Sequence, residues 1–238
     1  MKFLGEDERY FESRQSFSDQ LGSVELWSVI DQWPLFVGQT NLARSLAIVE
    51  LLRSTLNVPG DIAEFGCWKG STTLLFAKSL KLFDPMGPKI VHAFDSFEGL
   101  TEFHPSDSGV SERYATAYKG SREMLESCAR LAGVADGIRI HQGIIEKVLP
   151  EFAVQHPHVR FSLVYCDTDL YSATKTILAD TWRMITPGGL MVFDQWNMAE
   201  FPGEGIAVNE FMESATGTYE VIKPEFTRQP TLALRRLS

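Results

Sequence analysis

The chain has 238 residues, which is enough for one large α/β domain with an N-terminal appendage. Its formal net charge of -9 argues against a nucleic-acid backbone as partner, because that partner requires a basic face. The three cysteines are scattered and predict neither a disulfide framework nor a zinc site, and no apolar run is long enough to span a membrane. We therefore expect a soluble, cytoplasmic protein that acts on neither nucleic acid nor a membrane.

Residues 1–57 are expected to form an N-terminal arm and helical cover, and residues 58–238 the main domain. Aromatic residues are scattered over residues 1–20, and apolar residues recur at helical spacing between residues 21 and 57. Such helices can form a lid over a ligand or simply pack on a sheet, and the spacing leaves both open. The aromatic arm favours self-association, so we expect a homo-oligomer.

Residues 61–70 predict the first strand–turn–helix unit of a parallel sheet. An apolar run contains Glu64 near its end, and Gly66 and Gly70 follow before a helix begins. The glycines lack the order of a dinucleotide fingerprint, and Lys69 precedes Gly70 instead of following it as in a P-loop. A carboxylate also repels phosphate, so we expect a ligand with ammonium or hydroxyl groups. The pattern resembles the first motif of S-adenosylmethionine-dependent methyltransferases.

Two further strand ends are predicted to hold the same ligand. A strand over residues 89–95 ends at Asp95, where an ionised carboxylate can accept both hydroxyl hydrogens of a ribose. Capping of the next turn by Asp95 and Ser96 is the alternative. A third strand ends at Gly143, which with Ile144 offers backbone and apolar surface to an adenine ring.

An acidic pair is predicted to carry the chemistry. Strands over residues 161–167 and 190–194 end at Asp167 and Asp194, and neighbouring strands lie about 4.8 Å apart, so one cation can bind between the two carboxylates. Oxygen ligands favour Mg²⁺, with Gln195 as a third ligand. A bound cation lowers the pKa of an alcohol, whose proton Asp167 or Asp169 can accept. The alternative for Asp169 is to cap the following helix.

The order of strands and helices predicts an α/β fold. Two more strands are expected near residues 219–222 and 231–234, after five strands that alternate with helices. The predicted fold is a doubly wound, mostly parallel, seven-stranded Rossmann-like sheet with an N-terminal helical lid.

Four motifs together resemble the macrocin O-methyltransferase family. They are Glu64-Phe-Gly-Cys-Trp-Lys-Gly, Asp95-Ser-Phe-Glu-Gly-Leu, Asp167-Thr-Asp-Leu-Tyr-Ser, and Pro187-Gly-Gly with Asp194, between about residues 58 and 211. The resemblance implies a metal-dependent enzyme that methylates a sugar hydroxyl of a small glycosylated metabolite, with S-adenosylmethionine and Mg²⁺ as cofactors. It implies the class I methyltransferase fold. It also places Ser121 at the cofactor.

The predicted site residues follow from the motifs and the resemblance together. The cofactor-binding set is Glu64, Phe65, Gly66, Trp68, Gly70, Ser71, Asp95, Ser96, Phe97, Ser121, Gly143, Ile144, Ile145 and Asp167. The metal set is Asp167, Asp194 and Gln195, and the candidate bases are Asp167 and Asp169. Gln195 departs from the family, which usually has an acidic residue there. A phenol or catechol acceptor, or a domain that binds cofactor without turnover, are the alternative functions.

Overall fold

A computed structural model describes residues 8, 12, 25–115, 117–215 and 217–238 of the chain. In this part of the chain seven strands form one sheet, in the order β3-β2-β1-β4-β5-β7-β6. Strand β7 runs antiparallel to both of its neighbours, and the other neighbouring pairs are parallel. The strands are β1 (Asp61–Phe65), β2 (Val91–Asp95), β3 (Ile138–Gln142), β4 (Phe161–Cys166), β5 (Ile185–Phe193), β6 (Tyr219–Ile222) and β7 (Leu232–Arg236). The predicted doubly wound, mostly parallel sheet is confirmed.

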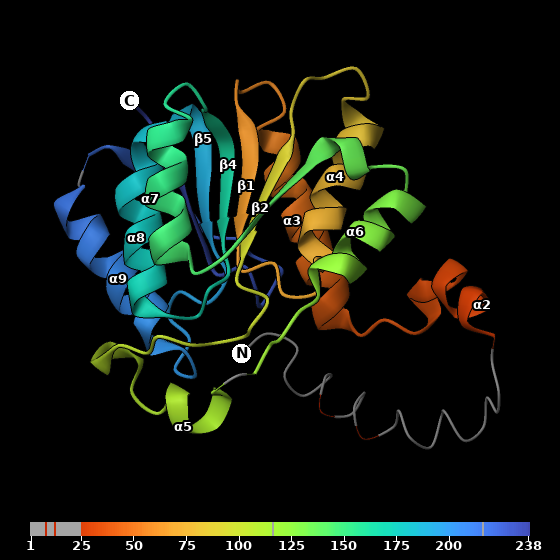
Figure 1. Cartoon of the computed structure of the whole chain (residues 1–238), viewed down its shortest axis with the longest axis horizontal. Coiled ribbons are helices and arrows are strands. Elements are labelled where there is room, and N and C mark those ends of the chain that lie inside the picture. The colour runs from red at the N-terminus through yellow and green to blue at the C-terminus, as the bar shows by residue number, and fades with distance from the viewer. Residues whose placement is uncertain (1–7, 9–11, 13–24, 116, 216) are drawn as a thin grey trace.

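Helices cover both faces of the sheet (Figure 1). One face carries α3 (Gln39–Ser54), α4 (Ser71–Phe83) and α6 (Arg122–Leu131), and the other carries α7 (Ile145–Gln155), α8 (Tyr171–Thr181) and α9 (Pro202–Ser214). Each layer encloses an apolar cluster, with Phe76 on the first side and Phe152 on the second. Burial on both faces explains why the central strands are mostly apolar and do not alternate between apolar and polar residues.

The register of the central strands brings their carboxyl ends together. Phe65 of β1 pairs with Cys166 of β4, and Cys166 pairs with Phe193 of β5. The residues that follow these three therefore emerge side by side. Strands β1 and β4 are neighbours although their crossover connections run to opposite sides, which is where open α/β sheets form a binding crevice.

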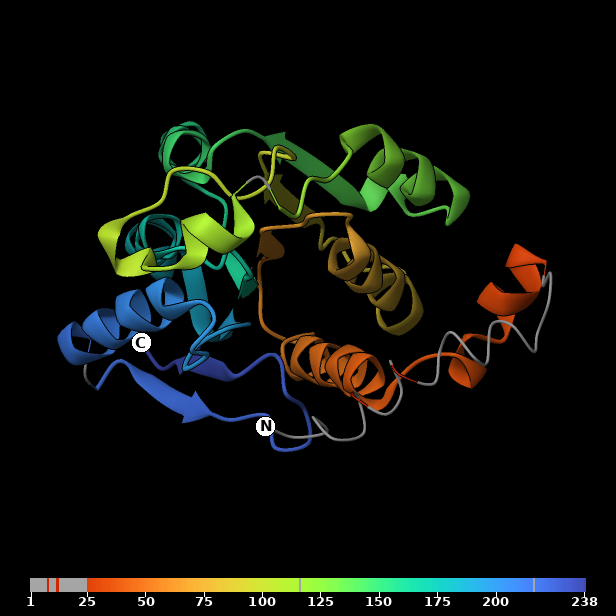
Figure 2. The same cartoon turned by 90° about the horizontal axis from the view of Figure 1, so that it is seen from below.

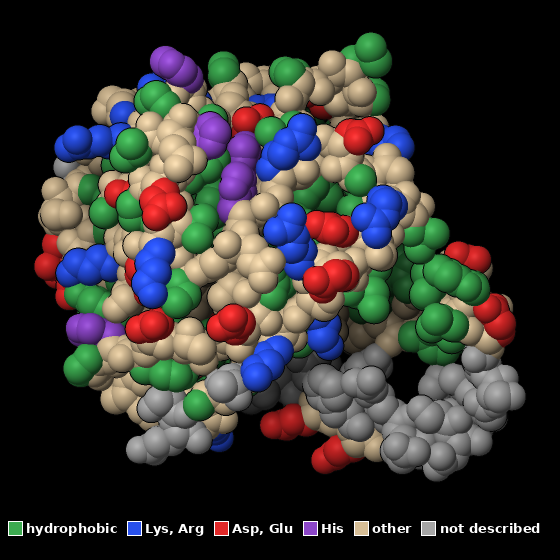
Figure 3. Space-filling model, in the orientation of Figure 1, with side chains coloured by type: hydrophobic (Ala, Val, Ile, Leu, Met, Phe, Trp, Pro, Cys, Tyr) green, Lys and Arg blue, Asp and Glu red, His purple; other side chains and the backbone are tan. Residues whose placement is uncertain are grey.

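The N-terminal segments differ in how they pack. Helix α3 lies against the body of the domain, whereas α2 (Leu26–Asp31) and a short 3₁₀ helix (Trp33–Leu35) stand away from it in both views (Figures 1 and 2). Hydrophobic side chains gather over α2 on the surface in Figure 3, and Leu26 is 63% exposed. Within the described residues 25–57 of the predicted cover, the segment that packs against the domain is therefore α3. The predicted aromatic arm lies almost wholly outside the described residues.

The remaining short helices connect these layers. They are α5 (Val110–Tyr114) and the 3₁₀ segments Pro105–Asp107, Ala135–Gly137 and Trp182–Met184. In the described part of the chain, no helix combines the length and apolar character needed to cross a membrane.

Candidate active site

A cavity of about 900 Å³ opens at the carboxyl ends of β1, β2, β4 and β5. Its walls include thirteen residues of the predicted site: Glu64, Gly66, Trp68, Ser71, Asp95, Ser96, Gly143, Ile144, Ile145, Asp167, Asp169, Asp194 and Gln195. Its volume is typical of sites that enclose a small molecule. Strand register alone explains why side chains from separate motifs face the same space.

The turn after β1 requires glycine at position 66. Gly66 has a φ of +87°, and a Cβ there would lie 1.9 Å from the carbonyl oxygen of Asp167. The ends of β1 and β4 thus approach more closely than any side chain permits. This close approach leaves bare backbone at the cavity wall.

Glu64 is buried beside this turn. The Thr73 hydroxyl donates a hydrogen bond to its carboxylate. Burial raises the pKa of Glu64 to about 8, and the nearby charge of Asp167 acts in the same direction, against the Thr73 hydrogen bond. A positively charged or hydroxyl-bearing ligand in the cavity would relieve this unfavourable burial of a carboxylate.

Asp95 binds the backbone of the turn that follows it, which is the structural role that the sequence offered as an alternative to ribose binding. Its two oxygens accept backbone N–H groups, from Trp68 at 2.7 Å and from Phe97 at 2.6 Å. Burial raises the pKa of Asp95, and these two hydrogen bonds oppose the rise. Each oxygen keeps a second lone pair, so ribose binding by Asp95 stays a prediction.

Four residues of the predicted cofactor set do not line the cavity. The ring of Phe65 stacks on Phe94 in the core at 4.6 Å, because side chains alternate between the two faces of a strand. Gly70 precedes α4 with a φ of +81° and a Leu125 side chain packed against it. Phe97 is buried in the turn after β2. Ser121 caps α6 by accepting the Met124 N–H.

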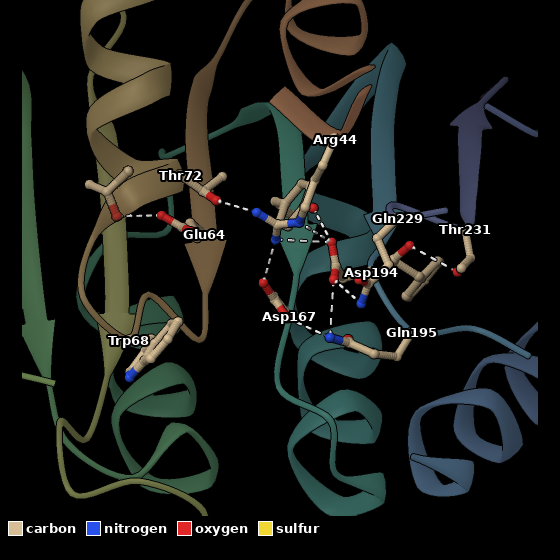
Figure 4. Close-up of polar contacts among 12 residues, drawn as sticks. Arg44, Glu64, Trp68, Thr72, Asp167, Asp194, Gln195, Gln229 and Thr231 are labelled. Carbon is tan, nitrogen blue, oxygen red and sulfur yellow. Dashed lines mark hydrogen bonds and ion pairs between the residues drawn. The ribbon is translucent and has the colours of Figure 1, made fainter. Parts of the chain in front are cut away.

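The acidic pair does converge, and an arginine lies between the two carboxylates (Figure 4). Nη2 of Arg44 is 2.8 Å from Asp167 Oδ2 and 3.0 Å from Asp194 Oδ1. Its Nε is 3.3 Å from the same Asp194 oxygen, and its Nη1 donates to Thr72 Oγ1 at 3.2 Å. Burial lowers the pKa of Arg44, but the negative charges of Asp194 and Asp167 outweigh it, so the pKa lies above its ordinary value.

Amide groups donate to the two remaining oxygens of the pair, and a phenol shares one oxygen with Arg44. Nε2 of Gln195 donates to Asp167 Oδ1 at 2.8 Å and to Asp194 Oδ2 at 3.1 Å. Gln229 Nε2 donates to Asp194 Oδ2 at 2.8 Å, and the Tyr165 hydroxyl donates to Asp194 Oδ1. Burial raises the pKa of Asp167 to about 7; the charge of Asp194 adds to the rise and that of Arg44 opposes it.

This arrangement does not fit the predicted Mg²⁺ site. Each of the four carboxylate oxygens already accepts at least one N–H or O–H. Gln195 turns its NH₂ group to the pair, whereas a metal ligand must present its oxygen. Among the described residues, no group of three or more His, Cys, Asp and Glu side chains is placed to hold a metal ion.

Asp169 differs from Asp167 and Asp194, whose carboxylate oxygens all accept hydrogen bonds. It is 8% exposed at the cavity wall, with a φ of +64°, and its Oδ1 has no hydrogen-bond partner within the described chain. Burial raises the pKa of Asp169, and the charges of Asp167 and Asp194 raise it further. The alternative role as a helix cap is wrong, because the cap position of α8 is Leu170. The backbone N–H of Tyr171 instead bonds to Asp107 Oδ1 at 2.8 Å.

Sequence reasoning missed Arg44, Tyr165 and Gln229. Arg44 follows Ala43 on the helical face that packs on the domain, and nothing local distinguishes it from a solvent-exposed arginine. Gln195 was the one signal in the sequence for such a partner. A neutral amide beside two carboxylates leaves their negative charge to be balanced by another part of the chain.

The strand order and the cavity at the β1–β4 switch point define a class I S-adenosylmethionine-dependent methyltransferase fold. The model of the macrocin O-methyltransferase (TylF) family matches residues 31–223. The chain therefore belongs to this family, as the four motifs predicted.

Individual relatives and solved structures agree with this assignment. The chain is 25% identical over 174 residues to mycinamicin III 3''-O-methyltransferase of Micromonospora griseorubida, a match that covers 70% of this chain and 65% of that protein. It is 25% identical over 146 residues to a tetracenomycin 4'-O-methyltransferase of Streptomyces olivaceus, covering 58% and 54%. The matches thus span less than two thirds of both relatives.

Two solved structures have the same fold. Calicheamicin methyltransferase CalS11 superposes with a TM-score of 0.79 at 24% identity, covering 98% of this chain and 93% of that chain. The O-methyltransferase NovP gives 0.72 at 22% identity, covering 85% and 84%. At these identities the likeness concerns the fold.

Proposed function

We propose that this protein transfers a methyl group from S-adenosylmethionine to a sugar hydroxyl of a small glycosylated metabolite. The observation that carries the proposal is the convergence of the Gly66 turn, Asp95 and Asp169 on one cavity, in a chain of the TylF family. The relatives' names, which refer to methylation of mycinamicin and of a rhamnosyl tetracenomycin, support a sugar hydroxyl as acceptor.

The cofactor would lie across the ends of β1 and β2. Its amino-acid end meets the bare backbone of Gly66 near Glu64, its ribose meets Asp95, and its adenine meets Gly143 and Ile144. A carboxylate suits an ammonium or a hydroxyl donor, and no phosphate has to be accommodated. The sulfonium methyl then faces the Asp167–Asp169 side of the cavity, where the acceptor is expected.

Asp169 is the base in this proposal. Asp167 is the weaker candidate, because Arg44 and Gln195 each donate to one of its oxygens and so stabilise its charged form, whereas Asp169 Oδ1 has no partner in the described part of the chain. A lone pair of the acceptor oxygen forms the new O–C bond and the C–S bond breaks with its electrons passing to sulfur. The hydroxyl proton moves to Asp169, so a neutral thioether and a methyl ether result.

Mg²⁺ has no part in this proposal, because the donors around the acidic pair do not fit it. A phenol or catechol acceptor remains the alternative, and a cofactor-binding protein without turnover is a further one. An acceptor screen with methyl-labelled cofactor separates these: transfer to glycosylated metabolites supports the proposal, transfer to catechols alone favours the alternative, and no transfer favours the non-catalytic protein.

The base is tested by Asp169→Asn. We expect methyl transfer to fall by about 10²–10⁴-fold, with cofactor affinity measured by calorimetry close to that of wild type. Asp136→Asn is the matched control, because Asp136 is exposed and lies before β3, away from the cavity. Full activity of D169N would remove Asp169 from the mechanism, and failure of the wild type to bind the cofactor would defeat the function itself.

A further inference from the structure

We propose that the guanidinium of Arg44 takes the place of a divalent cation at the acidic pair, so that methyl transfer in this chain proceeds without a metal ion. The inference rests on the proposed function for its catalytic meaning, but the contacts that support it do not depend on the identity of the substrate.

The first observation is the position of Arg44. A single nitrogen, Nη2, contacts one oxygen of each carboxylate, at 2.8 Å from Asp167 and 3.0 Å from Asp194 (Figure 4). This is the bridging position that a cation held by two neighbouring strand ends would occupy. The other guanidinium nitrogens bond to Asp194 and to Thr72. All three nitrogens of the guanidinium therefore have partners, and its planar shape fixes its orientation between the two carboxylates.

The second observation is the direction of the surrounding amides. Gln195 bridges the pair through its NH₂ group, and Gln229 adds another N–H to Asp194. Two adjacent carboxylates attract amide hydrogens and repel an amide oxygen, so the charges dictate this orientation. If a dication were bound, the side-chain amide of Gln195 would have to rotate so that its oxygen faced the ion. The network is therefore built around carboxylates whose counter-charge is supplied by the protein.

The third observation is how closely the acidic pair is enclosed. Asp194 is almost fully enclosed, with its side chain 2% exposed, while the side chains of Asp167 and Arg44 are 21% and 24% exposed toward the cavity side. An Mg²⁺ ion needs close contacts to oxygen of about 2.0–2.1 Å in octahedral geometry. It could enter only by displacing Arg44, which would leave a partly buried guanidinium without its carboxylate partners.

Arg44 would supply a fixed positive charge near the reacting hydroxyl. It is permanently protonated, so it cannot act as base, and it is assigned here as a positioning residue that holds Asp167 and Asp194. The hydroxyl proton still leaves to Asp169. Electrostatic stabilisation by a preorganised group needs no exchange with solvent ions, in contrast to a metal site.

The experiment measures metal binding directly, with no substrate present. The full chain, treated with EDTA and dialysed, is titrated with Mn²⁺, and free Mn²⁺ is followed by electron paramagnetic resonance. We expect no binding by the wild type up to millimolar Mn²⁺, and at least about a tenfold gain in affinity for Arg44→Met. Arg53→Met is the matched control, because Arg53 lies on the same helix and contacts Phe83 instead of the site.

Micromolar Mn²⁺ binding by the wild type would overturn the proposal, and so would an R44M variant that binds no more tightly than R53M. Should R44M not fold, the thermal melting of the wild type decides the question. Its midpoint is expected to be unchanged by Mn²⁺ or Mg²⁺, and a clear rise would contradict the inference. Failure of cofactor binding, measured separately by calorimetry, would refute the proposed function but would leave the metal-binding result unaffected.

Discussion

Replacing Gly66 by alanine should damage both stability and cofactor binding. The new Cβ would meet the Asp167 carbonyl oxygen at 1.9 Å, on a residue whose φ is +87°. The left-handed backbone costs roughly 1–2 kcal/mol for a residue with a Cβ, and the forced separation of two strand ends adds roughly 1–3 kcal/mol. We expect a total of about 2–5 kcal/mol.

Gly217→Ala separates the two contributions. Gly217 has a similar φ of +85°, but nothing lies within 4 Å of a Cβ built there. It should lose only the backbone part, so the difference between the variants measures the clash. At roughly 2–4 °C per kcal/mol for a domain of this size, G66A should melt roughly 2–12 °C below G217A.

Calorimetry with the demethylated cofactor gives the functional readout. We expect G66A to bind it at least about tenfold more weakly, because the displaced backbone forms the cavity wall. G217A should bind as wild type. Equal melting temperatures and equal affinities for the two variants would refute the close approach of β1 and β4 as the reason for glycine.

Two further predictions concern buried carboxylates. Because the pKa of Glu64 is raised from 4.5 to about 8, its contribution to stability is present below about pH 4.5 and is lost as the pH rises through about 8. Glu64→Gln should therefore gain stability relative to wild type over this range, on the order of a few kcal/mol in urea unfolding, and a pH-independent difference would contradict the shift. Asp107→Ala leaves the buried N–H of Tyr171 and the part-buried N–H of His104 without their acceptor and should cost about 1–3 kcal/mol. Asp136→Ala, at an exposed position, should cost almost nothing, and similar losses for the two would speak against a structural role for Asp107.

Much of the fold could be predicted because its signals are local. The apolar runs that end in Glu64–Phe65, Asp95 and Asp167 are buried strands, and glycine at position 66 follows the first of them. Parallel pairing then forces their ends to one edge of the sheet. The gathering of thirteen predicted residues around one cavity follows from this geometry.

The partners of the acidic pair were beyond such reasoning. Arg44 lies 123 residues before Asp167 and 150 before Asp194, and Gln229 lies 35 residues after Asp194. Which side chain reaches a strand end depends on how α3 rotates and packs against the sheet. Helical spacing predicts the buried face of α3, but it does not say what lies opposite a residue beside that face.

The sequence by itself determined the class of fold, the glycine turn and the carboxylates at four strand ends. Each of these features depends on a short contiguous segment, and strand pairing then decides which segments lie side by side. Only the tertiary structure decided what neutralises those carboxylates. A charge buried beside another charge takes its counter-ion from whatever the packing brings within about 3 Å, and here α3 brings a guanidinium where the motifs alone predicted a metal ion.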